Sequence, residues 1–272
     1  MTYFTSEKIE PTVTRINCPG AVYAFLVEGK DRALLIDTGL GCGDLSAYVK
    51  TLTDLPVTVF LTHGHLDHAG GLIGFDDIHV NRGDWTLIEN DSLDARYNYT
   101  LGNPGGLEIR KEDFQPGYKG QLQDVQPGEK FDLGGVTVTA LPLKGHTDGM
   151  MAAYIAPQKS LILGDGLNSA TFFFLGSATI SEYREVLLDL AAMDDEIGTV
   201  YYSHPHNYGG KEIIRQGVAQ CEDILAGKDD RVEMPMGLAR GMTIYASKAQ
   251  TPDMKNADGT CANIFYRPEQ VR

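Results

Sequence analysis

The sequence predicts an α+β fold in which two β-sheets pack face to face and helices cover the outer faces, a four-layer αββα sandwich. The main observation is a pattern that occurs once in each half of the chain: paired apolar strands, an amphipathic helical run and a further apolar strand. A second observation is the length of 272 residues, which allows a large core within one domain. We therefore expect a single domain over residues 1–272.

The first half begins with two strands, "AVYAFLVEG" and "RALLIDTG", which a turn at "GKD" joins. The second of these strands ends at Asp37. The run "GDLSAYVKTL" has the apolar spacing of a helix with Asp44 as its N-cap, and "VTVFLTH" is a continuous apolar strand that ends at His63. Further along, "HAGGLIGF" predicts the start of a helix, and "IHVNRGDWTLIE" predicts another strand and helix.

The second half repeats this order. A hairpin is predicted at "EKFDLGGVTVTALPL", and "MAAYIAP" pairs with "SLILGDG", which ends at Asp165. The run "SEYREVLLDLAAM" predicts an amphipathic helix with Ser181 as its N-cap, and "IGTVYYSH" predicts a strand that ends at His204. After one more helical run, "GGKEIIRQGVAQCEDILAG", the tail predicts strands and turns.

Residues 90–126 interrupt the pattern, because they are rich in Tyr, Asn, Gly and Pro and show little periodicity. A long segment of this kind inside a compact domain is typical of a functional loop. It carries Tyr97, Tyr99, Phe114 and Tyr118 between Gly and Pro hinges, which predicts a lid over the apolar part of a substrate. The alternative is a peripheral loop or a contact in a homodimer.

The composition excludes several classes of function. Lys and Arg total 23 against 37 Asp and Glu, and a net charge of −14 repels polyanions such as nucleic acids. The N-terminus has no basic region followed by an apolar stretch, and no run approaches 18 apolar residues, so we expect a cytoplasmic protein without membrane association. The cysteines lie far apart with no CxxC pair, which favours buried, reduced thiols over disulfides or a thiolate zinc site at Cys18, Cys42, Cys221 and Cys261.

The stretch "LTHGHLDHAGG" contains three of the seven histidines. Residues two apart point the same way in an extended chain, so His63 and His65 can reach one ion. Asp67 and His68 lie on the adjacent turn and suit a second ion. Burial of these groups without a cation would cost about 1–3 kcal/mol for each unpaired group. The cluster therefore predicts metal binding rather than core packing.

Four donor residues come at the ends of apolar runs: His63, His146, Asp165 and His204. Strand ends are rigid platforms from which side chains can converge on one crevice. Imidazole nitrogen and carboxylate oxygen are ligands for zinc and other divalent transition metals, and a hydrolytic site keeps one position open for water. The sequence therefore predicts a catalytic metal site.

The motif "THGHLDHAGG" resembles the HxHxDH signature of metallo-β-lactamase-fold hydrolases. The motifs "GHTDG", "LILGDG" and "YYSH" are similar to that family's later ligand motifs in order and approximate spacing, and "LLIDTG" is similar to its early strand. The resemblance covers the chain from about Ala21 to His204 and implies the metallo-β-lactamase fold.

Carried over position by position, the resemblance implies two metal ions. The first would bind His63, His65 and His146. The second would bind Asp67, His68 and His204, and Asp165 would bridge the two ions. Asp37 would orient a ligand by hydrogen bonding, or it is a turn-forming residue before Gly39. We expect zinc, with iron or manganese as alternatives.

His206 competes with His204 in "SHPHN". The family pattern places the ligand at the strand end, and Pro205 turns the chain before His206, so we choose His204. His206, Asn207 and Tyr208 then become candidates for binding substrate, or they are ordinary polar loop residues. We expect His79, in "DIHVN", to pack on a strand.

The expected reaction follows from two bound cations. A bridging hydroxide would attack the carbonyl of a small ester, thioester or lactone, and Asp67 would orient that hydroxide or accept a proton. A small-molecule phosphodiesterase is the alternative. A di-iron redox protein is disfavoured, since it would normally have Glu in place of His65 and a flavin partner domain. A binding-only role would predict lost ligands, yet every ligand position is filled.

Within the family, the chain resembles the glyoxalase II-like and lactonase-like branch. Glyoxalase II itself is similar in size, but the tail lacks the signal of its C-terminal helical domain, so we do not expect glyoxalase II itself. A secreted β-lactamase would carry a signal peptide, which we do not expect here.

Overall fold

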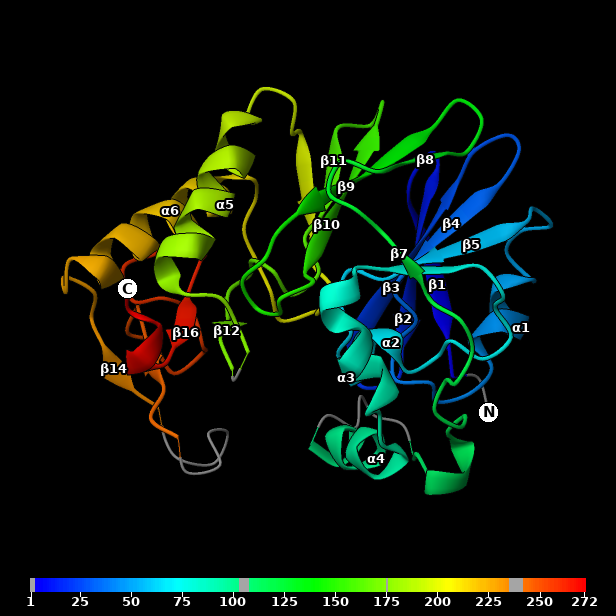
Figure 1. Ribbon diagram of the computed structural model, residues 1–272, viewed down its shortest axis with the longest axis horizontal. Helices are drawn as coiled ribbons and strands as arrows, with labels where there is room; N and C mark the ends of the chain where they lie inside the picture. The colour runs from blue at the N-terminus through cyan, green and yellow to red at the C-terminus, as the bar shows by residue number, and fades with distance from the viewer. Residues whose placement is uncertain (1–2, 103–107, 175, 235–241) are drawn as a thin grey trace. The chain divides into compact units, whose positions relative to one another are not determined.

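The computed structural model describes residues 3–102, 108–174, 176–234 and 242–272. Contacts between Cα atoms divide the chain into two compact units, which we describe separately. The first consists of residues 1–141, 153–157 and 203–205, and the second of residues 142–152, 158–202 and 206–272. Figure 1 shows both units as mixtures of strands and helices.

The first unit contains a seven-stranded sheet whose strands lie side by side in sequence order. The first four strands pair antiparallel and the later ones parallel, with Ile36 opposite Phe60. Because the carboxyl ends of parallel strands meet at one edge, the turns after Ile36 and Phe60 leave the sheet together. The strands are β1 (Thr5–Glu10), β2 (Val13–Cys18), β3 (Val22–Glu28), β4 (Ala33–Ile36), β5 (Val57–Phe60), β6 (Ile78–Val80) and β7 (Gln123–Asp124).

Short helices connect the parallel strands of this sheet. Asp44 caps the first helix as predicted, since its Oδ1 accepts a hydrogen bond from the Ala47 N–H at 2.9 Å. The predicted helix at "HAGGLIGF" is wrong: the helix there begins earlier, at Leu66, and ends at Ala69, before the two glycines. The helical elements are α1 (Leu45–Val49), α2 (Leu66–Ala69), η1 (Arg82–Asp84), α3 (Trp85–Glu89), α4 (Leu93–Gly102) and η2 (Lys111–Asp113).

A hairpin of β8 (Lys130–Asp132) and β9 (Thr137–Pro142) forms where the sequence predicts it. Within the first unit, the ring of Phe131 lies 5.5 Å from that of Phe60 in β5, so the hairpin packs on the sheet. His79 in β6 is on a strand as expected, with its ring 5.2 Å from Phe131. Apolar side chains of the sheet form a core from which water is excluded, and its members include Leu26, Leu35, Val59, Leu61 and Ile78.

The second unit contains two long helices that lie side by side (Figure 1). Gly217 permits their close approach, because a Cβ atom there would lie 2.9 Å from Cδ1 of Leu187. The helices are α5 (Ile180–Ala192) and α6 (Glu212–Leu225), and a short η3 (Pro268–Gln270) lies near the C-terminus.

Two sets of strands accompany these helices. β11 (Ser160–Ile162) and β13 (Thr199–Tyr201) pair in parallel, and β10 (Met151–Ala156) has residues in both units. The tail forms strands and turns as predicted, and its strands β15 and β16 join β12 and β14 in a four-stranded sheet of order β12-β16-β15-β14. Its strands are β12 (Thr171–Phe172), β14 (Val232–Glu233), β15 (Tyr245–Ala246) and β16 (Ile264–Tyr266).

Several predicted boundaries are wrong by two or three residues. β5 ends at Phe60 and β13 at Tyr201, so His63 and His204 lie on turns that follow the strands. The N-cap of α5 is Thr179 rather than Ser181: Thr179 Oγ1 accepts from the Glu182 N–H at 3.2 Å, and Glu182 Oε2 accepts from the Thr179 N–H at 2.8 Å. This reciprocal pair satisfies two N–H groups at the helix end, which Ser181 inside the helix cannot do.

The proposed lid segment, residues 90–126, contains more regular structure than its composition predicts. Ten of its residues form α4, although residues 103–107 lie outside the described part of the chain. Phe114 is buried against Leu40 and Cys42, and Tyr97 packs edge-on against Phe114 with ring centroids 6.2 Å apart. These aromatic side chains pack inside the first unit, and the lid remains a prediction.

All four cysteines are free and buried, as predicted. Burial raises the pKa of the Cys18, Cys42 and Cys221 thiols to about 12. A thiol that stays protonated at neutral pH is a poor nucleophile. Within the described residues, no helix combines the length and the apolar character needed to cross a bilayer.

We predict that Thr179→Ala lowers the free energy of unfolding by about 1 kcal/mol, because it removes a side-chain cap from α5. Ser181→Ala is the matched control and should change it by less than about 0.5 kcal/mol. Urea denaturation followed by circular dichroism measures both values. A larger loss in Ser181→Ala would show that the cap lies at Ser181.

Candidate metal centre

The turn after β5 carries the first donor residues. The Thr62 N–H donates to Asp37 Oδ1 at 2.7 Å, which holds this turn beside the one that follows β4. The chain stays extended to His65, the N-cap of α2, with ψ of 153°. Asp67 and His68 then lie on the single turn of α2, and both are buried. An extended stretch followed by one helical turn therefore presents four donor side chains within six positions.

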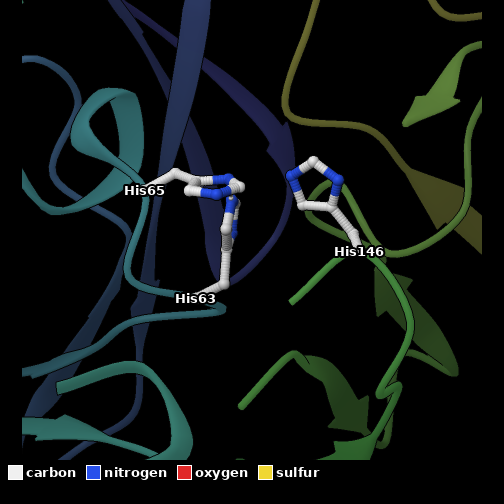
Figure 2. A group of neighbouring side chains, drawn as sticks. All are labelled: His63, His65 and His146. Atoms are coloured by element: carbon white, nitrogen blue, oxygen red, sulfur yellow. Dashed lines mark hydrogen bonds between the residues drawn. The ribbon is translucent and has the colours of Figure 1, made fainter. Parts of the chain in front are cut away.

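His63 and His65 form the first pair of donors. His63 Nε2 lies 3.1 Å from His65 Nδ1, and the two rings are nearly perpendicular at 82°. The Thr62 hydroxyl is 3.1 Å from the other ring nitrogen of His63, Nδ1. Figure 2 shows these two imidazoles and that of His146, and the three residues form one of two groups that could hold a metal ion.

Asp67 is the centre of the second group. Its Oδ2 lies 3.8 Å from His68 Nε2 and 3.6 Å from His204 Nε2. The rings of His68 and His204 are 5.5 Å apart and nearly perpendicular at 80°. Asp165 completes this second group of residues that could hold a metal ion.

Hydrogen bonds from Nδ1 orient three of the imidazoles. Nδ1 of His68 is 2.8 Å from Asp37 Oδ2, that of His204 is 2.9 Å from the Ala21 carbonyl oxygen, and that of His146 is 2.5 Å from the Phe172 carbonyl oxygen. When Nδ1–H donates in this way, the neutral ring presents the lone pair of Nε2 to a metal. These contacts therefore select the tautomer that metal binding requires.

Asp37 is fully buried and joins the two turns. Its Oδ2 accepts from the Thr62 hydroxyl at 2.8 Å as well as contacting His68. Its φ of 62° lies in the left-handed region, which is unfavourable for a residue with a Cβ atom. Asp37 therefore lies in a turn and also makes the hydrogen bonds to Thr62 and His68 that would orient the His68 ring.

The donor groups fit divalent metal ions. Five imidazoles and two carboxylates make up the two groups, and these are ligands for zinc, iron or manganese. Two ligand atoms about 2.0–2.1 Å from one tetrahedral zinc ion lie about 3.3 Å apart. The separations of 3.1, 3.6 and 3.8 Å within the groups are close to that value.

The predicted substrate-binding residues follow His204 in the chain. His206 is exposed and Asn207 is half-buried, with amide atoms that are enclosed and make no hydrogen bond to a described residue. The Tyr208 hydroxyl accepts from the Asn256 N–H at 3.0 Å and donates to the Thr260 carbonyl oxygen at 3.3 Å. Tyr208 is therefore anchored to the C-terminal segment, and substrate binding by these residues remains a prediction.

Sequence reasoning missed several groups that support the donors. Thr62 could have been found, because it directly precedes His63 and a hydroxyl there can reach the same turn. The Ala21 and Phe172 carbonyl oxygens have no signal in the sequence, since every residue carries a carbonyl.

The chain matches a known protein family and is similar in sequence to several named proteins. The model of the family described as "Metallo-beta-lactamase superfamily" matches residues 19–204. The chain is 26% identical over 216 residues to the acyl-coenzyme A thioesterase MBLAC2 of Bos taurus, a match that covers 70% of this chain and 75% of the relative. It is 24% identical over 246 residues to hydroxyacylglutathione hydrolase 1 of Vibrio vulnificus, covering 86% and 85% of the two chains.

A solved structure is similar in fold. The metallo-β-lactamase from Pontibacter korlensis matches with a TM-score of 0.61 and 18% identity, over 81% of this chain and 99% of that one. At this identity the likeness concerns the fold alone.

We predict that Asp37→Asn lowers the affinity of the group of Asp67, His68 and His204 for a divalent metal ion by about 10–100-fold, because the amide no longer accepts from His68 Nδ1 with a full charge. Competition with a chromophoric chelator measures the affinity. Asp44→Asn is the matched control, since Asn also caps helices well. An unchanged metal affinity in Asp37→Asn would show that Asp37 only forms the turn and does not orient His68.

Proposed function

The chain belongs to the metallo-β-lactamase superfamily, and on this premise we propose that it is a dinuclear metal-dependent hydrolase that cleaves small thioesters. The predicted metallo-β-lactamase fold and hydrolase class are confirmed by the family match, the named relatives and the solved structure. The observation that carries the dinuclear proposal is the presence of two separate donor groups.

The residues of each group have distinct proposed roles. His63, His65 and His146 would hold one ion, and Asp67, His68 and His204 the other, while Asp165 would be shared. Two divalent ions, when bound, supply a hydroxide nucleophile at neutral pH and polarise the substrate carbonyl. Asp67 is the proposed proton acceptor, because its carboxylate lies among the donor nitrogens of its group.

A covalent thiol mechanism is disfavoured by the cysteines. Burial raises the pKa of three thiols to about 12, and that of Cys261 is also raised, first by burial and then by Glu212. Protonated thiols do not attack carbonyls efficiently. Hydrolysis by a water molecule that the bound metal ions activate would need no side-chain nucleophile.

The named relatives and the net charge of the chain support a thioester as the substrate. An acyl-CoA thioesterase and a hydroxyacylglutathione hydrolase are among the similar proteins. The net charge of −14 disfavours substrates with many negative charges, so we propose a thioester of a small acyl group and a weakly charged carrier. Oxygen esters, lactones and small phosphodiesters are the competing substrates, and zinc is the proposed metal.

We predict that His63→Ala lowers kcat/KM by more than about 100-fold and reduces the bound metal, because it removes a ligand while the fold remains. Metal analysis, circular dichroism and hydrolysis assays measure the three quantities. His79→Ala is the control, since His79 lies on β6 and contacts Asp77 at 3.0 Å outside both donor groups. A chelator-treated, metal-depleted enzyme that keeps full activity would exclude the mechanism.

We predict that a thioester is hydrolysed at least about 10-fold faster, in kcat/KM, than the oxygen ester, the lactone or a small phosphodiester. The assay uses acylglutathione, acyl-CoA, an oxygen ester of the same acyl group, a lactone and bis(p-nitrophenyl) phosphate. The enzyme is loaded in turn with zinc, iron and manganese. Fastest turnover of the phosphodiester would replace the thioesterase proposal with a phosphodiesterase.

A further inference from the structure

Arg96 in α4 is among the largest side chains that are fully buried in the described part of the chain. Its Nη1 donates to the carbonyl oxygens of Leu40 at 3.0 Å and Gly70 at 3.3 Å, and its Nη2 donates to the Gln115 carbonyl oxygen at 2.8 Å. Its Nε lies 3.1 Å from Asp91 Oδ2. A guanidinium is rarely buried unless its charge is paired. Arg96 has Asp91 as its counter-ion, and both of its terminal nitrogens donate to carbonyl oxygens.

Two of these carbonyls belong to the turns that carry proposed metal-centre residues. Leu40 lies three residues after Asp37, and Gly70 lies two residues after His68. Gly70 is also the C-cap residue of α2, where carbonyl oxygens lack helical partners and a cation is favourable. Arg96 therefore links the end of the Asp37 turn to the end of the helix that carries His68.

Backbone hydrogen bonds join the same two turns. The Thr38 N–H donates to the His68 carbonyl oxygen at 2.7 Å, and the Gly70 N–H donates to the Gly39 carbonyl oxygen at 2.8 Å. These bonds lie between the Asp37–His68 contact and the Arg96 contacts. A shift at the Arg96 end would therefore change the distance between Asp37 and His68.

Gly41 leaves the space that this arrangement requires. Its φ is +72°, and a Cβ atom there would lie 2.2 Å from the Gly70 carbonyl oxygen and 2.6 Å from Arg96 Nη1. Only a residue without a side chain permits the turn, the end of α2 and the guanidinium to meet so closely.

We propose that Arg96, with Asp91 as its counter-ion, is a positioning residue that holds the Asp37 turn against α2 and so sets the orientation of His68 and Asp67. Arg96 acts through backbone carbonyls and touches none of the donor atoms described above. The inference rests on the proposed metal-dependent function, but its first test needs no metal.

The first test measures amide hydrogen exchange in the metal-free protein. Arg96→Ala should speed exchange at the Thr38 and Gly70 amides by at least about 10-fold more than at amides of β2 and β3. Gln220→Ala is the control, because it removes buried hydrogen bonds to Ala262 and Ser247 in the second unit. Equal changes at the Thr38 and Gly70 amides in both variants would overturn the proposal.

The second test measures zinc affinity by chelator competition. Arg96→Ala should weaken the ion bound by Asp67, His68 and His204 by about 10-fold or more, and the ion bound by His63 by less than about 3-fold. Arg96→Lys preserves the fold better. It should weaken the same ion selectively but by a smaller factor than Arg96→Ala, because one ammonium keeps the charge yet cannot reach all four acceptors.

The outcomes separate this inference from the proposed function. Wild-type protein that binds two zinc ions, with Arg96→Lys and Arg96→Ala that bind both equally well, would overturn the role of Arg96 alone. Equal weakening of both ions in the Arg96 variants, matched by Gln220→Ala, would also overturn it, because general loss of stability would then explain the effect. Wild-type protein that binds no zinc would overturn the metal-dependent function and this inference together.

Discussion

The buried hydrogen bond between Asp37 and His68 is the interaction on which the site depends. Its 2.8 Å contact joins the turn after β4 to α2, and both side chains are fully inaccessible to water. A buried carboxylate is stable only when its oxygens accept enough hydrogen bonds, and Thr62 supplies the others through its N–H and hydroxyl. The same contact selects the tautomer of His68, so one interaction serves both the fold and the chemistry.

The parallel part of the first sheet provides the platform for this interaction. Pairing of Ile36 with Phe60 brings the ends of β4 and β5 to one edge, and the two turns that follow then lie close enough for their backbones to pair. The apolar strands beneath are rigid because they are close-packed, whereas the turns themselves contain strained or glycine conformations at Asp37 and Gly41. Arg96 and its partners reinforce these turns from α4.

The chemistry of the site is consistent with its surroundings. Nitrogen and carboxylate donors form two groups, the thiols are buried, and carbonyl oxygens accept hydrogen bonds from the imidazoles of His146 and His204. Such an arrangement suits activation of water rather than attack by a side chain.

The sequence alone determined the donor motif, the hairpins, the helices α5 and α6 and the burial of the cysteines, because these depend on local spacing and on residue type. It did not determine where strands end, why Thr179 rather than Ser181 caps α5, or that residues 93–102 form a helix. Neither could it indicate the contact of Arg96 with Leu40, 56 residues away along the chain, or that of the Ala21 carbonyl oxygen with His204, 183 residues away. Only the tertiary structure decides such contacts, since backbone carbonyls are identical in every residue and acquire their role from their position in space.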